Sequence, residues 1–157
     1  MVDMPEQGHL RRLDVVWQRQ PLYFITTCLD QRRPLLAAPE VHAIFLDEWG
    51  SWCERHGWAV GRYVIMPDHV HFFTMPLAEG NQSLGRTVGK WKEWTAKRIL
   101  KSCGGSAPLW QPEFFDHLVR SKESFREKWE YVRNNPVRAG LVDEAGKWPY
   151  AGWIDFQ

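Results

Sequence analysis

The chain has 157 residues, 44% of them hydrophobic, and 20 Lys and Arg against 19 Asp and Glu give it a formal net charge of +1. This length and composition predict one globular domain over residues 1–157, and no apolar run approaches the roughly 18 residues of a membrane span, so we expect a cytoplasmic protein. The near-neutral charge does not by itself indicate a nucleic-acid-binding protein, and three scattered cysteines without a CxxC pair argue against a disulfide framework or a zinc knuckle.

The first half of the chain alternates strand and helix patterns. Segment 22–29 is β-branched and aromatic, which predicts a strand. Pro39 then opens a helix whose apolar residues recur at three- and four-residue steps as far as Gly57. Segments 58–66 and 69–77 predict two strands joined by a tight connection, that is, a β-hairpin.

The second half of the chain supplies two long helices and one strand. A helix runs from the N-cap Ser83 to Cys103, a strand covers 114–120, and a helix capped by Ser121 runs to the pre-proline residue Asn135. The order of elements predicts an α+β protein with a ferredoxin-like split βαβ fold. Its antiparallel sheet is expected to carry helices on one face and the additional C-terminal helix, with Tyr131, on the other.

His69 and His71 are the first candidates for chemistry. One apolar residue separates them in a strand pattern, so both imidazoles point from the same face and can grip a metal ion. A lone HxH pair is nevertheless often incidental. Asp68 is either a turn residue or the partner that orients one of the rings.

Tyr131 and Asn135 form the second candidate group. Tyr131 lies about 120° away from the apolar stripe of its helix, which places it on a wet surface or in a cleft. Asn135, four residues later, would share that flank and offer an amide oxygen as a third ligand. The alternatives are a surface phenol and an asparagine that only ends the helix before Pro136.

Taken together, these four residues predict cleavage of a phosphodiester. A phenol with a pKa of about 10 is a weak nucleophile at neutral pH and needs assistance. A divalent cation held by His69, His71 and Asn135 would polarise the phosphate and keep coordination positions open for it. Mixed imidazole and amide ligands suit Mn²⁺ somewhat better than Mg²⁺, although cellular abundance can select either metal. The phosphotyrosine product would allow strand transfer without a nucleotide energy source.

Three segments also carry a family resemblance: 66–71 (MPDHVH), 110–117 (WQPEFFDH) and 131–142 (YVRNNPVRAGLV). They resemble the REP-associated tyrosine transposases, a branch of the HUH single-tyrosine transposases, and the similarity runs from about Arg11 to Trp153. The resemblance implies that the histidine pair and Asn135 are ligands of Mg²⁺ or Mn²⁺ and that Tyr131 is the nucleophile. It also implies cleavage of single-stranded, hairpin-forming palindromic DNA through a 5′-phosphotyrosine, by a protein expected to be a monomer, with a dimer as the alternative.

Basic residues are candidates for contacts with the DNA backbone. Helix 84–103 has an apolar arc and, opposite it, a basic arc. The basic arc consists of Arg86, Lys90, Lys97 and Lys101, and its alternative interpretation is a solvated helix face. Arg11, Arg12, Arg32 and Arg33 are further candidates.

Two other classes of protein fit part of the pattern. An HUH replication initiator or relaxase shares the histidine pair but often has a third histidine soon after it, and here none follows His71 before His117. A non-enzymatic nucleic-acid-binding module of ferredoxin-like fold would use the same sheet as a stacking platform, with Tyr131 as a surface residue. Formation of a covalent DNA adduct separates the enzyme from the binding module.

Overall fold

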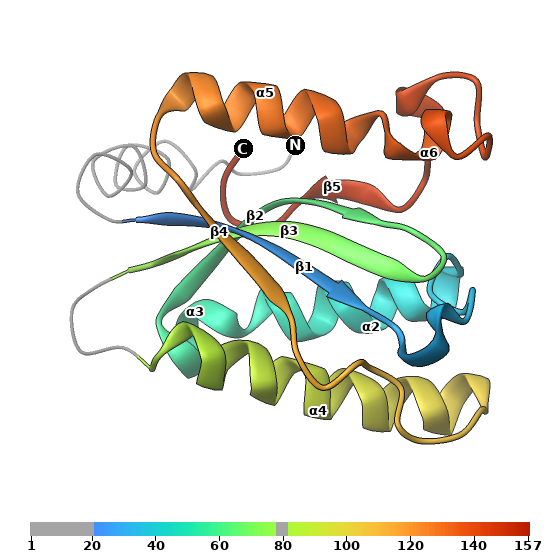
Figure 1. Cartoon of the computed structure of the whole chain (residues 1–157). Coiled ribbons are helices and arrows are strands. Elements are labelled where there is room, and N and C mark those ends of the chain that lie inside the picture. The colour runs from blue at the N-terminus through green and yellow to red at the C-terminus, as the bar shows by residue number, and fades with distance from the viewer. Residues whose placement is uncertain (1–20, 78–81) are drawn as a thin grey trace, which may run out of the picture.

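A computed structural model describes residues 21–77 and 82–157 (Figure 1). Within them, five strands form one antiparallel sheet in the order β4-β1-β3-β2-β5. The strands are β1 (Leu22–Cys28), β2 (Trp58–Ile65), β3 (His69–Pro76), β4 (Phe115–Val119) and β5 (Ala151–Trp153). The first four follow the predicted strands to within one or two residues.

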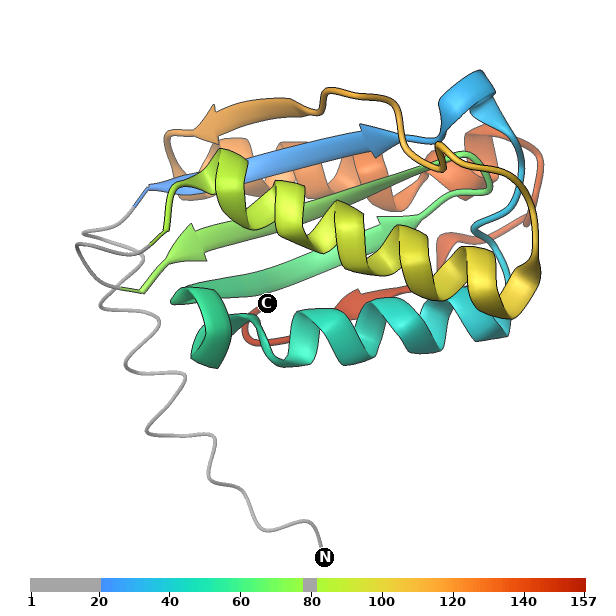
Figure 2. The same ribbon diagram turned by 90° about the horizontal axis from the view of Figure 1, so that it is seen from below.

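Helices cover both faces of this sheet. The helices are α2 (Pro39–Gly50), α3 (Trp52–His56), α4 (Leu84–Cys103), α5 (Lys122–Arg133) and α6 (Asn135–Arg138), with short 3-10 turns η1 (Asp30–Arg32) and η2 (Ala145–Lys147). Figures 1 and 2 show α2, α3 and α4 on one face and α5 on the other. The predicted α+β, ferredoxin-like arrangement with an additional tyrosine-bearing helix is therefore confirmed. No helix in the described part of the chain is long and apolar enough to cross a membrane.

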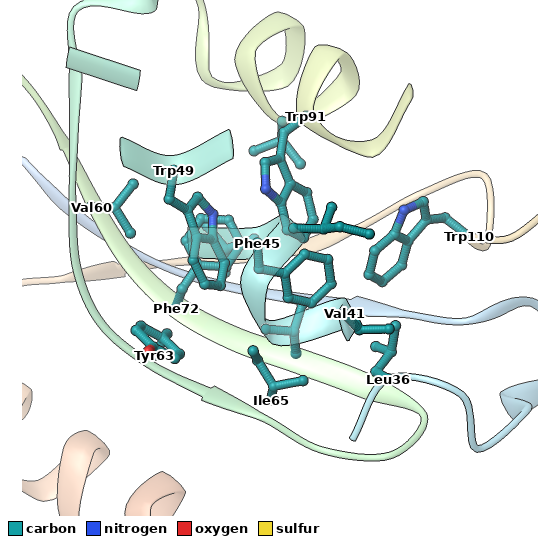
Figure 3. Packing of buried hydrophobic residues seen from close by; sticks show 14 of the residues in the cluster. Leu36, Val41, Phe45, Trp49, Val60, Tyr63, Ile65, Phe72, Trp91 and Trp110 are labelled. Atoms are coloured by element: carbon teal, nitrogen blue, oxygen red, sulfur yellow. The ribbon is translucent and has the colours of Figure 1, made fainter. Parts of the chain in front are cut away.

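The main core lies between the sheet and helices α2 and α4, and it is rich in tryptophan (Figure 3). The indoles of Trp49 and Trp91 stack with ring centroids 5.5 Å apart, and Phe45 packs against both. Large aromatic side chains bury more apolar area than any others, so this cluster is the principal source of stability. Most tryptophans of the described residues thus serve packing, as expected for a small domain.

Strand β3 connects this core to the opposite face of the sheet. Its even-numbered residues Val70 and Phe72 are fully buried against the helices α2 and α4. Its odd-numbered residues point the other way, and Phe73 packs edge-on against Phe125 of α5. The alternation of a strand therefore places His69 and His71 on the face that α5 covers.

The structure differs from the sequence-based expectations at two places in this frame. The helix predicted from Pro39 to Gly57 is interrupted at Ser51 and continues as α3. The short strand β5 was not predicted, because three residues of sequence Ala-Gly-Trp show neither alternation nor strong β propensity. Pairing with β2 creates this strand, and its register joins Gly152 to Tyr63.

Candidate functional site

The two histidines of β3 lie side by side, with ring centroids 4.8 Å apart. Thr26 on the neighbouring strand β1 contacts Nδ1 of His71 through its hydroxyl at 2.8 Å, because Thr26 and His71 are partners in the register. Phe24 stacks on the same ring. In His69, Nδ1 lies 2.7 Å from Oδ1 of Asp68. Each Nδ1 thus has a partner, which leaves both Nε2 atoms as the nitrogens available for a ligand.

Asp68 links His69 to Arg32. Its Oδ2 accepts a hydrogen bond from Nε of Arg32 at 2.8 Å, while its Oδ1 accepts a hydrogen bond from Nδ1–H of His69. Nη2 of Arg32 is 3.4 Å from that same Nδ1, but a nitrogen that already donates to Asp68 cannot also accept, so Arg32 acts there as a nearby charge. Of the two interpretations of Asp68, the structure supports the partner that orients a ring.

Both imidazoles are held in the neutral form that binds metal ions. Burial lowers the pKa of His69, and the Asp68 carboxylate offsets this only in part. Burial, together with the charges of His69, Lys128, Arg138 and Arg32, lowers the pKa of His71 to about 3. Burial alone would raise the pKa of Asp68, but hydrogen bonds from Arg32 and His69 bring it below its ordinary value.

A surface cavity of about 450 Å³ lies beside His69, and we call it the His69 cavity. Its walls come from the β2–β3 connection, the η1 turn and the segment around α6. They include Arg32, Asp68, His69, Asn135 and Arg138. The fold therefore brings the predicted amide ligand and one of the two histidines to the same cavity, from positions 66 residues apart in sequence.

Tyr131 and Asn135 are arranged differently from the prediction. Helix α5 ends at Arg133, and Asn135 begins the separate helix α6, because Pro136 has no N–H with which to continue the helix. The expectation that both residues stack on one helix is wrong. Instead Arg138 connects them: its Nη2 donates to Oδ1 of Asn135 at 2.7 Å, and its guanidinium carbon lies 3.8 Å from the centroid of the Tyr131 ring.

The side chain of Tyr131 is 65% exposed, which agrees with its predicted position outside the apolar stripe of α5. Phe125, Trp129 and Val132 form that stripe and pack on the sheet. Tyr131 does not line the His69 cavity; its link to that cavity runs through Arg138, which lines it. The phenol is thus free to meet a large substrate at the surface.

The chemistry of these donors fits a divalent cation. Two neutral imidazoles on one strand, each fixed through Nδ1, can supply two ligands to a divalent cation. Within residues 21–77 and 82–157, no cluster of three or more His, Cys, Asp or Glu side chains is placed to hold a metal ion. Asn135 supplies an amide oxygen at the His69 cavity and is the candidate for a third protein ligand.

The lowered pKa of His71 predicts a pH dependence of stability. Above pH 6.5 the ring is neutral whether the chain is folded or unfolded; between pH 6.5 and about 3 only the unfolded chain binds the proton. The free energy of unfolding should therefore fall on acidification, by up to about 1.4 kcal/mol per pH unit. Urea unfolding in EDTA should show that the wild type loses roughly 1.5 kcal/mol more than His71→Gln between pH 6.5 and 5. Parallel curves for the two proteins would contradict this.

The basic arc of α4 lies far from the histidines. Arg86, Lys90, Lys97 and Lys101 are exposed, but α4 covers the opposite face of the sheet (Figure 2). Glu93 pairs with Lys90 and Lys97 at 3.7 and 3.2 Å, which reduces the charge of the arc. Arg11 and Arg12 lie outside the described residues. Arg33 is occupied with the backbone oxygens of Asp30, Ser106 and Pro108.

Two residues of the site were missed from the sequence. Thr26 lies in a strand whose register with β3 no local pattern reveals. Arg138 falls inside the segment 131–142 that carries the family resemblance, and its position three residues after Asn135 is a usable signal, because a single helical turn brings such a pair into contact. Arg32 was considered only for DNA contact, yet it braces Asp68.

An antiparallel sheet with two neighbouring histidines on a central strand, covered by a helix that bears a tyrosine, is the arrangement expected from the resemblance to the single-tyrosine transposases. The comparison with protein families agrees. The family described as "Transposase IS200 like" matches residues 18–135, and the chain belongs to this family.

Individual relatives give a finer comparison. The chain is 29% identical to the REP-associated tyrosine transposase of Escherichia coli K12 over 134 residues, which is 82% of this chain and 74% of that protein. Among solved structures, a REP-associated tyrosine transposase bound to a REP hairpin matches with a TM-score of 0.66 at 24% identity, covering 83% of this chain and 75% of the other. At that identity the structural match supports the fold alone.

Proposed function

We propose that this transposase-family protein cleaves single-stranded, hairpin-forming DNA and becomes covalently attached to it through Tyr131. The observation that carries the proposal is the arrangement around Arg138, which contacts both the Tyr131 ring and the Asn135 amide while lining the cavity of His69. A nucleophile, a guanidinium and metal-binding groups thus belong to one continuous region of the surface.

The proposed reaction is a transesterification. Oη of Tyr131 attacks the phosphorus of the scissile phosphodiester; the Oη–P bond forms and the bond from phosphorus to the 3′ oxygen breaks. The phenol gives up one proton and the leaving 3′ oxygen takes one up, so a 5′-phosphotyrosine and a free 3′-hydroxyl result. No oxidant and no nucleotide is consumed, and the reverse attack by another 3′-hydroxyl would transfer the strand.

His69, His71 and Asn135 are the residues that would hold a divalent cation, Mg²⁺ or Mn²⁺, whose chemistry is to polarise the phosphate and neutralise developing charge. Asp68 and Thr26 orient the two rings through Nδ1. Arg138 adds a fixed positive charge between the amide and the phenol, where a phosphate would have to lie to reach Tyr131. A bidentate guanidinium contact would orient the phosphodiester for in-line attack.

The proposal that the substrate is hairpin-forming DNA rests on the family resemblance of the sequence and on the relatives. The structural relative named above was solved with a REP hairpin, and a curated relative carries the name of the same class. The exposed position of Tyr131 suits a polymer substrate, because a phenol at the surface can reach a strand that no closed pocket could admit. The decisive experiment incubates the protein with labelled hairpin DNA and Mn²⁺ and looks for a denaturation-resistant adduct on a gel.

Asp68 should control how much metal the reaction requires. We expect Asp68→Asn to raise the Mn²⁺ concentration for half-maximal adduct formation about 10- to 100-fold, because loss of a partner behind a metal-binding histidine weakens metal affinity by that range. Saturating Mn²⁺ should restore most of the yield. Asp143→Asn is the matched control, since Asp143 forms an exposed ion pair with Lys147. An unchanged Mn²⁺ requirement in Asp68→Asn would show that Asp68 is only a turn residue.

A further inference from the structure

A second cavity, of about 390 Å³, lies on the other flank of α5, and we call it the Arg62 cavity. It is lined by Arg62, Trp129, Glu130, Arg133, Trp153 and Gln157. At 100° per residue, Arg133 points about 160° away from Tyr131 on the helix. The Arg62 cavity is therefore distinct from the His69 cavity and shares no lining residue with it.

The guanidinium of Arg62 is the main feature of this cavity. It sits against two aromatic rings, 5.0 Å from the centroid of Trp129 and 5.7 Å from that of Phe125. Within residues 21–77 and 82–157, no carboxylate forms an ion pair with it and no acceptor forms a hydrogen bond with its donors. The nearby Glu130 pairs at 3.9 Å with Arg133 instead. A half-buried guanidinium whose five donors have no protein partner in the described part of the chain is suited to bind an anionic ligand.

The electrostatics of the cavity point the same way. Burial lowers the pKa of Arg62, the neighbouring charge of Arg133 lowers it further, and Glu130 only partly opposes these effects. The lining thus combines two guanidinium groups with one acidic side chain, Glu130, which pairs with Arg133. An anion between Arg62 and Arg133 would relieve their repulsion and replace the water that burial has removed.

The strand beside Arg62 offers an aromatic face, because Trp153 is the cross-strand partner of Arg62. Trp153 in the short edge strand β5 is 40% exposed, unlike the buried tryptophans of the core. Gly152 allows this strand to approach closely, because a Cβ at that position would lie only 2.9 Å from Oη of Tyr63. An exposed indole beside two guanidinium groups is the combination that binds unpaired nucleotides: bases stack on the ring and phosphates meet the arginines.

We infer that the Arg62 cavity binds one unpaired nucleotide of the DNA strand, with its phosphate between Arg62 and Arg133 and its base on Trp153. This inference rests on the proposed function for the identity of the strand. The volume suits a single nucleotide, since pockets for small ligands begin at about 300 Å³. The nucleotide held here lies on the flank of α5 away from the nucleophile, so it belongs to a segment of the strand outside the cleavage position.

The test is binding of the hexanucleotide (dT)6 to the full chain, by titration calorimetry in EDTA. Arg62→Gln should weaken binding at least tenfold and Trp153→Ser about fivefold or more, because loss of one stacked base corresponds to about 1–3 kcal/mol. Arg55→Gln is the matched control: it removes the same charge from an exposed position on α3. Thermal unfolding followed by circular dichroism checks each variant, and Trp153→Ser, at an exposed site, keeps the test valid should Arg62→Gln fail to fold.

The outcomes separate this inference from the proposed function. Equal (dT)6 affinity in wild type, Arg62→Gln and Trp153→Ser overturns the inference, even when Tyr131 forms its DNA adduct. Weakened binding in both variants, with Arg55→Gln still binding (dT)6 like the wild type, supports the inference even when no adduct appears. Loss in Arg62→Gln alone, reproduced with inorganic phosphate as the probe, would mean an anion site without base stacking and would also overturn it.

Discussion

Replacing Tyr131 with phenylalanine is expected to abolish the covalent DNA adduct. The variant removes one oxygen atom and retains the ring on which the Arg138 guanidinium rests, so the surrounding contacts should persist. Without Oη no Oη–P bond can form, and the yield of denaturation-resistant adduct with labelled hairpin DNA and Mn²⁺ should fall below detection. Stability should change little, since the tyrosine side chain is largely exposed.

The matched control for this variant is Tyr150→Phe. Tyr150 is another tyrosine in the C-terminal part of the chain, and its ring packs against Trp148. It should form adduct at the wild-type level. DNA retention by Tyr131→Phe in a gel-shift assay should stay within about twofold. If Tyr131→Phe still becomes covalently labelled, the nucleophile lies elsewhere; if the wild type binds DNA without any adduct, the protein is a binding module.

Removal of one histidine of the pair, His71, is expected to have the second largest effect on adduct formation. His71→Ala should reduce adduct formation a hundredfold or more, as should EDTA with the wild type, because electrostatic assistance to phosphate attack corresponds to several kcal/mol of barrier. Adding EDTA to the variant should then cause no further loss. The measurement is the initial rate of adduct formation at saturating DNA.

The control for His71→Ala is a histidine outside the site. His56 contacts Gln82 at the end of α3, and His56→Ala removes an imidazole without touching β3. It should leave the rate unchanged. Wild-type rates in EDTA would show that no metal takes part, whereas loss in EDTA together with normal rates in His71→Ala would mean that the cation is held by other groups.

Much of the fold could be predicted because the periodic patterns are strong. The alternating strand 69–76 and the apolar face of α4 each fix which side is buried, and the observed core follows both. The two predictions about the fold that failed concern short local features. Ser51 interrupts a helix whose apolar spacing continues through it, and β5 exists only because Tyr63 and its neighbours offer it an edge. Such features depend on tertiary contact rather than on the residues themselves.

The residue types of the candidate site could be predicted from the sequence, but the contacts between its residues could not. Two histidines with period two must share a face, and the structure confirms that they do. The partners Thr26 and Arg32 could not be derived, because one depends on strand register and the other on a turn in which Gln31 and Arg32 adopt left-handed backbone angles. The roles of the site residues and the metal remain predictions that the experiments above address.

The alternation of side chains in strand β3 limits which insertions and deletions the β2–β3 connection can tolerate. Even positions of the strand pack against helices α2 and α4, whereas the odd positions near its start, His69 and His71, carry the two candidate metal ligands. Deleting one residue between Ile65 and His69 would exchange the two sets, turning imidazoles inward and valine and phenylalanine outward. The length of the hairpin connection therefore constrains the site as strictly as the identities of the two histidines do.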